Sequence, residues 1–374
     1  MKRALPLWDP SGFAATWLML RAIIRRDGRP LAGAVLTAGI AASVATYQFA
    51  VYNSFLRAGA AGPRHFAADV WISERSVECF DFPTPFPTDY DQVIRADLPG
   101  AHIRRLAFGF APYVAPDGRR SSVALIGVDD TGLLPRGFLA DRSDTRRLGL
   151  DRGREASLGG ISFQHDGTVA SFATFLGAPY VVTDFDAGRH AIGLPTGQAS
   201  FLLVNFPDGA PDQLDARLQR LEQRWPELSA RTAADFSWSS SFFWQAKTGA
   251  GAAILLAALL AALLMAMLLT SGTARFLQRR HSDLVSLVGH GAGPESLAGL
   301  VTGVALLIGL GALGTAAVLV PLAVAMGRPL LPWVAAGAGD ALFALTMASL
   351  CTLLASIVGV RNVLKVSPDV IFRA

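Results

Sequence analysis

Apolar residues gather in four long runs, and one long polar segment separates the first run from the other three. The runs cover residues 31–52, 249–270, 297–321 and 341–360, whereas residues 57–246 mix charged and apolar positions. A helix needs about 20 mostly apolar residues to cross the hydrocarbon core of a bilayer, so each run is long enough. The pattern predicts a four-helix transmembrane α-protein in a one-plus-three layout, with an extracytoplasmic domain inserted between the first and second helices.

The same pattern sets the expected boundaries along the chain. In order, they are an amphipathic N-terminal segment (1–30), the first span (31–56), the outer domain (57–246), the second span (247–271), a cytoplasmic loop (272–296), the third span (297–326), an outer loop (327–340), the fourth span (341–360) and a cytoplasmic tail (361–374). Within the first segment, an apolar stripe at helical spacing is flanked by arginines, which is typical of a helix in the headgroup plane. The stripe is Phe13, Trp17, Leu20 and Ile24, and the arginines are Arg21, Arg25 and Arg26. A cytoplasmic extension of the first span is the alternative.

Basic residues predict the orientation of the spans. They cluster before the first span, after the second and after the fourth: Lys2, Arg3, Arg21, Arg25, Arg26, Arg29, Arg275, Arg279, Arg280, Arg361, Lys365 and Arg373. The opposite ends offer chiefly Arg57, Lys247 and Arg328. The positive-inside rule therefore places both termini in the cytoplasm and residues 57–246 outside. A cleaved signal peptide ending near Ser43-Val44-Ala45 is the alternative for the first span, but the apolar run continues beyond it, which favours a retained anchor.

Charge and cysteine content narrow the function classes. The whole chain carries a formal charge of +4 with a pI near 9.4, yet residues 57–246 contain more acidic residues than arginines and no lysine. The basic excess therefore lies beside the spans, which argues against a nucleic-acid-binding role. Cys79 is expected outside the membrane and Cys351 within the fourth span, so a disulfide framework is not expected.

The outer domain alternates between strand-like and helix-like patterns, which predicts an α+β domain. The expected strands are 69–73, 102–114, 122–128, 200–206 and 228–232, and the expected helices are 89–97 and 211–225. These elements form two β-α-β halves, so we expect two small lobes. Residues 134–155, rich in Arg, Asp and Gly, are expected to form a solvated loop between the halves.

The sequence contains no motif for catalysis, for a cofactor or for a metal ion. It lacks the G-x-S-x-G, C-x-x-C, H-E-x-x-H and phosphate-loop patterns, so it is not expected to bind a nucleotide by the phosphate-loop mechanism, and any ATP would be bound by a partner. The six histidines show no metal-ligand spacing. We therefore expect a non-catalytic protein.

Glycines in the third span are expected to let helices approach closely. Gly309, Gly311 and Gly314 match a dinucleotide fingerprint, but they lie inside an apolar run without a preceding strand. Together with Gly299 and Gly303 they are better explained as helix-packing positions. Two interpretations of Asp340 stay open: a gating carboxylate within the membrane, or a cap at the start of the fourth helix.

Several local motifs resemble FtsX/MacB-type (type VII) ABC transporter permeases. They are residues 279–289 (RRHSDLVSLVG) after the second span and residues 364–373 (LKVSPDVIFR) near the C-terminus. Residues 242–248 (FFWQAKT), with 160–163 (GISF) and 166–167 (DG), are similar to the DevC-like subgroup. The chain departs from the family pattern where His281, Ser286 and Ser367 replace its usual Glu, basic residue and Asp.

The resemblance implies a mechanism and a set of partners. It implies a homodimer in the bacterial inner membrane that binds a separate ABC ATPase subunit, with a MacB-like outer domain in the periplasm. A periplasmic adaptor (membrane fusion) protein and an outer-membrane channel would complete a tripartite exporter of lipid, glycolipid or peptide. Membrane lipid surrounds the spans, and no nucleic acid is involved. The residues implied in ATPase coupling are Arg279, Arg280, Asp283, Leu284, Leu287, Val288 and Gly289.

The sequence leaves open both the role of three apolar residues in the 279–289 segment and the function of the whole chain. Leu284, Leu287 and Val288 could present an apolar face to a groove on the ATPase, or they could pack against the ends of neighbouring spans. The same layout also serves lipoprotein release and regulation of cell-wall hydrolases. A membrane-anchored signalling module is the alternative outside transport, although the short cytoplasmic parts leave little room for an output domain.

Overall fold

The computed structural model describes residues 20–22, 24–26, 28–133, 136–150, 154–289 and 292–363. The chain divides into two compact units, which we call the helical unit and the sheet unit. The helical unit comprises residues up to 52, 253–326 and 335 onward, and the sheet unit comprises residues 53–252 and 327–334. Phe13, Trp17 and the C-terminal motif at 364–373 lie outside the described residues.

Four helices of the described chain are long and apolar enough to cross a membrane, judged by length and composition alone. They are α2 (Gly28–Gly59), α9 (Ala250–Arg279), α11 (Pro294–Gly327) and α12 (Ala338–Val363). Each is longer than the apolar run that predicts it. The end of α9 lies eight residues beyond the predicted end of the second span at 271, because Phe276 and Leu277 in its last turns are buried. A short helix, α10 (His281–Gly289), follows at once.

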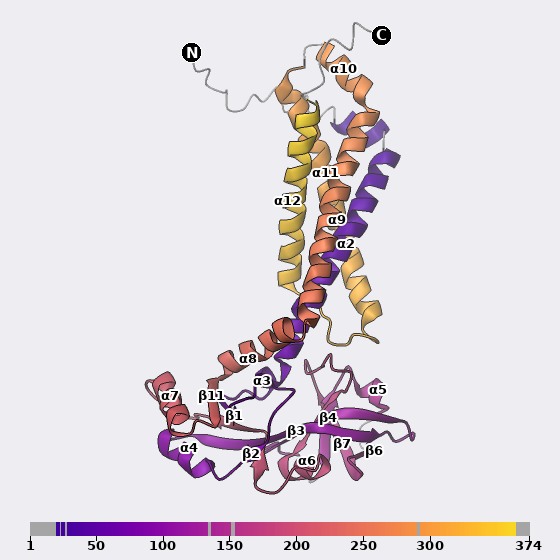
Figure 1. The fold of residues 1–374 in the computed structure, drawn as a ribbon. Coiled ribbons are helices and arrows are strands. Elements are labelled where there is room, and N and C mark those ends of the chain that lie inside the picture. Colours follow the sequence, from indigo (N-terminus) through magenta and orange to yellow (C-terminus); the bar gives the residue numbers. More distant parts are fainter. Residues whose placement is uncertain are drawn as a thin grey trace. The chain divides into compact units, whose positions relative to one another are not determined.

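In the helical unit these helices lie side by side as a bundle (Figure 1). Its core consists largely of small residues on the faces that meet, among them Ala38, Ala42, Ala305, Ala312 and Ala355. Small side chains let helix backbones approach closely, as in the membrane interior, where apolar burial gives no driving force of its own. Many of the large apolar side chains point outward, as Leu263, Leu310 and Leu353 do.

The sheet unit is built on one nine-stranded mixed sheet in the order β11-β1-β10-β3-β4-β8-β5-β7-β6. Its strands are β1 (Val70–Glu74), β3 (His102–Val114), β4 (Arg120–Val128), β5 (Gly137–Asp141), β6 (Glu155–Leu158), β7 (Ile161–Val169), β8 (Tyr180–Asp184), β10 (Phe201–Asn205) and β11 (Leu228–Thr232). Only β4–β8 and β5–β7 pair in parallel among the described strands. A further pairing of Tyr113 and Val114 in β3 with Leu158 and Ser157 in β6 closes six strands into a ring. A separate pair joins β2 (Phe86–Pro87) to β9 (Gln198–Ala199).

The sheet unit also contains short helices. They are α3 (Ala61–His65), α4 (Asp91–Asp97), α5 (Thr145–Leu148), α6 (Phe185–Ala191), α7 (Leu214–Arg224), α8 (Ala233–Phe242) and the π-helix η1 (Phe243–Lys247). Two begin at side-chain caps, which satisfy backbone N–H groups that have no partner within a helix. Asp184 accepts a hydrogen bond from the N–H of Asp186 at the start of α6, and Thr232 accepts one from Asp235 at the start of α8. Apolar residues of α4 and α7, including Ile94 and Leu221, pack on the strands.

Two predictions about the outer domain are wrong. Residues 134–155 are not simply a loop, because they contain β5 and α5, and β5 lies in the sheet between β8 and β7. The charged residues around this strand obscured the run Phe138-Leu139-Ala140, whose Phe138 and Ala140 are fully buried. The two expected lobes are also joined, since strands of both halves belong to the same sheet. Most of the other strands and helices expected from the pattern lie within about two residues of their predicted bounds.

Candidate coupling site

The short helix α10 has one buried face and one exposed face. Asp283 lies in its first turn, where a negative charge is favourable, and pairs with Arg280 just before the helix. The side chain of Leu284 is buried, 5% exposed, among Leu277, Leu297, Leu300, Val301 and Val363. Leu287 and Val288 are partly buried against the same cluster. The apolar face of α10 thus packs on the ends of α9, α11 and α12.

The exposed face of α10 is polar. His281, Ser282, Asp283, Ser286 and Gly289 are exposed along it, and Arg279 is exposed at the end of α9. The structure therefore separates the candidate coupling residues into two groups. Leu284, Leu287 and Val288 hold the helix to the bundle, whereas Arg279, Asp283 and Gly289 are on the accessible side. A partner that binds here meets charged and hydroxyl groups rather than leucines.

Two of the predicted packing glycines lie where helices approach most closely. A Cβ atom on Gly309 would fall 2.2 Å from Oγ1 of Thr352 in α12, and one on Gly311 would fall 2.5 Å from Cγ1 of Val35 in α2. Neither position has room for a side chain unless the partner moves. A Cβ on Gly303 would be 3.1 Å from Leu20, whereas one on Gly314 would meet open space. Gly299 is half-buried within α11.

Two further close-approach glycines were not identified from the sequence. A Cβ on Gly39 in α2 would lie 2.5 Å from Thr315, and one on Gly359 in α12 would lie 2.6 Å from Val301. Both lie in helices whose glycines are isolated rather than grouped. Neither glycine has another glycine two to four residues away, which is the spacing that identified the glycines of α11 as packing positions. Their contacts with the neighbouring helix are nevertheless about as close as those of Gly309 and Gly311.

Asp340 closes the start of α12. Its side-chain Oδ2 accepts a hydrogen bond from the backbone N–H of Gly337 at 2.8 Å, and its own N–H donates to the carbonyl of Gly337 at 3.1 Å. This reciprocal arrangement resembles a capping box, which satisfies a backbone donor at a helix start. The carboxylate is buried, 2% exposed. This geometry favours the capping role over the gating role.

The sheet unit contains a buried polar centre that the sequence did not indicate. The side chain of Asp81 is 2% exposed and accepts hydrogen bonds from the indole N–H of Trp244, at 2.9 Å, and from the hydroxyl of Tyr180. Burial raises the pKa of the Asp81 carboxyl to about 6, although both hydrogen bonds act to lower it. Trp244 belongs to the π-helix η1, a rare form often found at functional positions.

Aromatic rings surround Trp244 and bring distant parts of the sheet unit together. Phe175 lies with its ring centroid 4.7 Å from that of Trp244 and 4.5 Å from that of Phe55. Trp333, from the loop between α11 and α12, lies 6.4 Å from Phe55. We call Phe55, Phe175, Trp244 and Trp333 the aromatic junction. It joins the last turns of α2, a loop of the sheet, the segment before α9 and the α11–α12 loop.

Hydrogen bonds hold the segment 77–82 to α8 and η1. Ser240 accepts from the N–H of Phe80 at 3.2 Å, Ser239 donates to the carbonyl of Glu78 at 2.7 Å, and Lys247 pairs with the Glu78 carboxylate. On another side of α8, Ser241 donates to the carbonyl of Leu56 in α2 at 2.9 Å. The two chain segments that connect the sheet to the long helices are therefore tied to each other within the sheet unit.

The described residues offer little for catalysis or for a metal ion. Among them, no group of three or more His, Cys, Asp or Glu side chains could hold a metal ion. Burial raises the pKa of the Cys79 thiol to about 12, which makes it a poor nucleophile. The described arrangement packs helices closely, holds α10 against the ends of α9, α11 and α12, and fixes the segments that lead into the sheet.

Two solved structures resemble this chain over part of its length. One is the crystal structure of the periplasmic region of MacB from Actinobacillus actinomycetemcomitans, at 8% identity and a TM-score of 0.36, covering 46% of this chain and 91% of that one. The other is the extracellular domain of the noncanonic ABC-type transporter YknZ from Gram-positive bacteria, at 12% identity and a TM-score of 0.32, covering 44% and 99%. No protein-family model and no curated protein matches the chain. Each likeness covers less than half of this chain.

Proposed function

We propose that this chain is the membrane subunit of an ABC-type exporter, a permease of the FtsX/MacB type. The observation that carries the proposal is α10, a short helix between the second and third membrane-capable helices. Its apolar face packs on the ends of the bundle and its polar face is open to contact with another protein. The sheet unit, inserted in sequence between the first and second of these helices, supplies the part that would act outside the membrane.

In this mechanism the ATPase binds the polar face of α10. Because Leu284 is embedded among residues of α9, α11 and α12, a displacement of α10 has to move the ends of those helices or break the cluster. The leucines thus transmit force, and the exposed Arg279, Ser282 and Ser286 provide the contact surface. Along the chain, α2 continues without a break into the sheet unit, where the Ser241 hydroxyl donates a hydrogen bond to the carbonyl of Leu56 in the last turns of α2. In this mechanism, motion driven by ATP hydrolysis in the partner subunit passes through the helices of this chain to the sheet unit, and this chain needs no nucleotide-binding motif of its own.

Finer features of the proposal come from the sequence resemblance. They include a homodimer in the bacterial inner membrane, cytoplasmic termini, a periplasmic sheet unit, and assembly with an adaptor protein and an outer-membrane channel. The resemblance is also the basis for proposing the DevC-like subgroup and a lipid, glycolipid or peptide cargo. The chain itself is not an enzyme in this proposal, because ATP is hydrolysed by the separate subunit.

Cross-linking from α10 tests the proposal directly. In a variant without Cys79 and Cys351, a Ser282→Cys substitution should cross-link to the ATPase subunit produced with the chain. The matched control is Ser121→Cys, an exposed serine of the sheet unit that belongs outside the membrane in this topology. Cross-linking at both positions, or at Ser121 only, would contradict the proposed arrangement.

Nucleotide hydrolysis provides the second arm of the test. The purified chain should not hydrolyse ATP, and the complex with the ATPase should do so at a rate that depends on α10. Hydrolysis by the chain alone, in a preparation free of other ATPases, would refute the proposal.

A further inference from the structure

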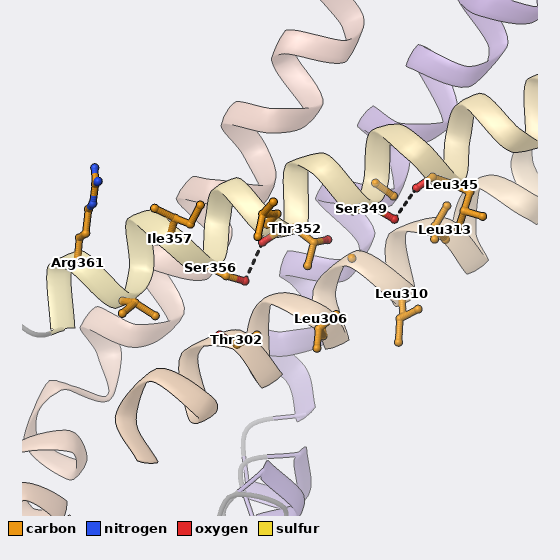
Figure 2. A pocket seen from close by; sticks show the side chains of 14 residues that line it. Thr302, Leu306, Leu310, Leu313, Leu345, Ser349, Thr352, Ser356, Ile357 and Arg361 are labelled. Carbon is orange, nitrogen blue, oxygen red and sulfur yellow. Dashed lines mark hydrogen bonds between the residues drawn. The ribbon is translucent and has the colours of Figure 1, made fainter. Parts of the chain in front are cut away.

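A groove of about 620 Å³ runs along the bundle between α11 and α12. Figure 2 shows the side chains that line it, which are predominantly apolar. The largest apolar side chains among them are Leu306, Leu310, Leu313, Leu345, Leu353 and Ile357. The groove exists because the two helices approach closely at Gly309, where Thr352 occupies the space of a side chain, while long side chains stand on either side of that line.

Two serine hydroxyls of the groove bond to their own helix. Ser349 donates to the carbonyl of Leu345 at 2.8 Å, and Ser356 donates to the carbonyl of Thr352 at 2.8 Å, both within α12 (Figure 2). Such bonds satisfy a hydroxyl on its own helix. The groove therefore offers an apolar surface, and its leucines are open to the surroundings: Leu310 is 63% exposed and Leu353 is 58% exposed.

A single charge lies among the groove residues. Arg361, in the last turn of α12, is exposed and lines one end of the groove. From Leu345 to Arg361 the helix rises roughly 24 Å at about 1.5 Å per residue. One leaflet contributes about half of a hydrocarbon core that is roughly 30 Å thick, so the groove is long enough to follow a leaflet from the headgroups inward. A guanidinium group matches the geometry of a phosphate and pairs with it bidentately.

We propose that this groove binds one anionic phospholipid of the leaflet on the α10 side. One acyl chain lies along the leucines, and the phosphate pairs with Arg361. Basic residues between membrane helices on the cytoplasmic side commonly hold anionic headgroups. The proposal rests on the membrane placement of the bundle within the proposed function, but not on the binding of an ATPase.

A second copy of this chain is a less suitable occupant. Closed dimers are usually isologous, so each copy presents the same surface to the other. A groove-to-groove contact would bring the two Arg361 guanidinium groups into the same interface, and like charges at a low-dielectric contact repel. A phosphate supplies the complementary charge instead.

Native mass spectrometry of the purified full-length chain tests the proposal, with phosphatidylglycerol and phosphatidylcholine as probes. The wild-type chain should retain phosphatidylglycerol in preference to phosphatidylcholine. Ser349→Trp fills the groove and should abolish retention. Its matched control is Thr346→Trp, which places the same ring on another exposed position of α12 outside the groove lining, where the hydroxyl also bonds its own helix.

A second pair of variants separates the charge from the groove. Arg361→Gln should weaken phosphatidylglycerol binding about tenfold or more, the loss expected for one charge-assisted hydrogen-bonded contact. Arg275→Gln removes an exposed arginine of α9, outside the groove lining, and should leave binding unchanged.

Two results would overturn the proposal: equal retention of both lipids, and undiminished retention of phosphatidylglycerol by Ser349→Trp. If Ser349→Trp keeps its lipid but loses a dimer, a second copy of the chain covers the groove. Failure of α10 to cross-link would leave these lipid measurements unaffected, so the two proposals fail separately.

Discussion

Replacing Asp81 with Asn removes a buried charge while keeping the shape of the side chain. The carboxyl is almost fully buried, and its pKa in the folded protein is raised from 3.8 to about 6. The amide oxygen of the introduced asparagine would still accept from the Trp244 indole, and its amide N–H could donate to the Tyr180 oxygen. The substitution therefore tests the cost of the charge without leaving either neighbour unpaired.

The sign and size of the effect follow from linkage between protonation and folding. Below pH 3.8 the carboxyl is protonated in both states, so its charge costs nothing. Between pH 3.8 and about 6 the unfolded chain releases the proton while the folded chain keeps it, so stability falls as pH rises. Above about pH 6 the full penalty is present. At about 1.4 kcal/mol per unit of pKa, the penalty is on the order of 3 kcal/mol.

We expect Asp81→Asn to stabilise the protein at pH 7.5 and to lose that advantage as the pH falls toward 4.5. For a unit of about 200 residues, a change on the order of 3 kcal/mol corresponds to roughly 6–12 °C in the unfolding temperature. The measurement is tryptophan fluorescence of the full chain in detergent during heating, at several pH values. The difference between the two proteins isolates Asp81, because Asp144, whose pKa burial also raises to about 6, is present in both.

The control is Asp117→Asn, which changes a carboxyl on the surface whose pKa is lowered by hydrogen bonds from Arg119. It should not reproduce the pH-dependent gain between pH 4.5 and 7.5. A difference between wild type and Asp81→Asn that does not vary with pH would refute the account of the buried charge. A less stable Asp81→Asn protein at pH 7.5 would mean that the charged carboxylate is needed by Trp244 and Tyr180.

Further substitutions test the packing and the topology. Leu284→Ala should lower the free energy of unfolding of the bundle by about 2–5 kcal/mol, measured by thermal unfolding, because truncation of a buried leucine leaves a cavity. Ser282→Ala should not have this effect, and equal effects of the two substitutions would mean that Leu284 is not held as described. Gly309→Leu should cost about 1–3 kcal/mol or more by forcing α12 away, whereas the same change at Gly314, which faces open space, should be tolerated; the reverse order would contradict the helix contacts. Single cysteines at Ser121 should react with an impermeant thiol reagent from outside intact cells, and those at Ser282 should not; labelling at Ser282 would reverse the orientation.

The long helices could be predicted from the sequence because their signal is local. An apolar run such as 249–270 specifies a helix whatever surrounds it, and the alternating patterns at 102–114 and 228–232 specify strands in the same way. The strand at Gly137–Asp141 lacked such a signal, since its position in the sheet depends on neighbours distant in sequence. Its short apolar run is flanked by arginines and aspartates that belong to the adjacent turns.

In the candidate site, too, the features with a local sequence signal could be predicted, and those that depend on contacts distant in sequence could not. The family resemblance pointed to residues 279–289 and their spacing to an apolar face, but whether that face would be buried depends on Val301 and Val363, which lie in other helices. The polar centre at Asp81 could not be found from sequence, because its partners Tyr180 and Trp244 are 99 and 163 residues away. A lone aspartate between two phenylalanines has no pattern of its own. Tertiary contact, not spacing, creates its raised pKa.

The closure of β6 onto β3 decides where the large sheet can be extended. Six strands form a ring, and a strand inside a ring has hydrogen-bonding neighbours on both sides. Of the nine described strands of this sheet, only β11 has a single partner, β1. An extended peptide that joins a sheet needs an unpaired strand edge. Any such addition to this sheet, whether by a client segment or by an aggregating neighbour, therefore begins along β11, where it has to displace the Glu222 carboxylate that accepts a hydrogen bond from the backbone N–H of Ala230.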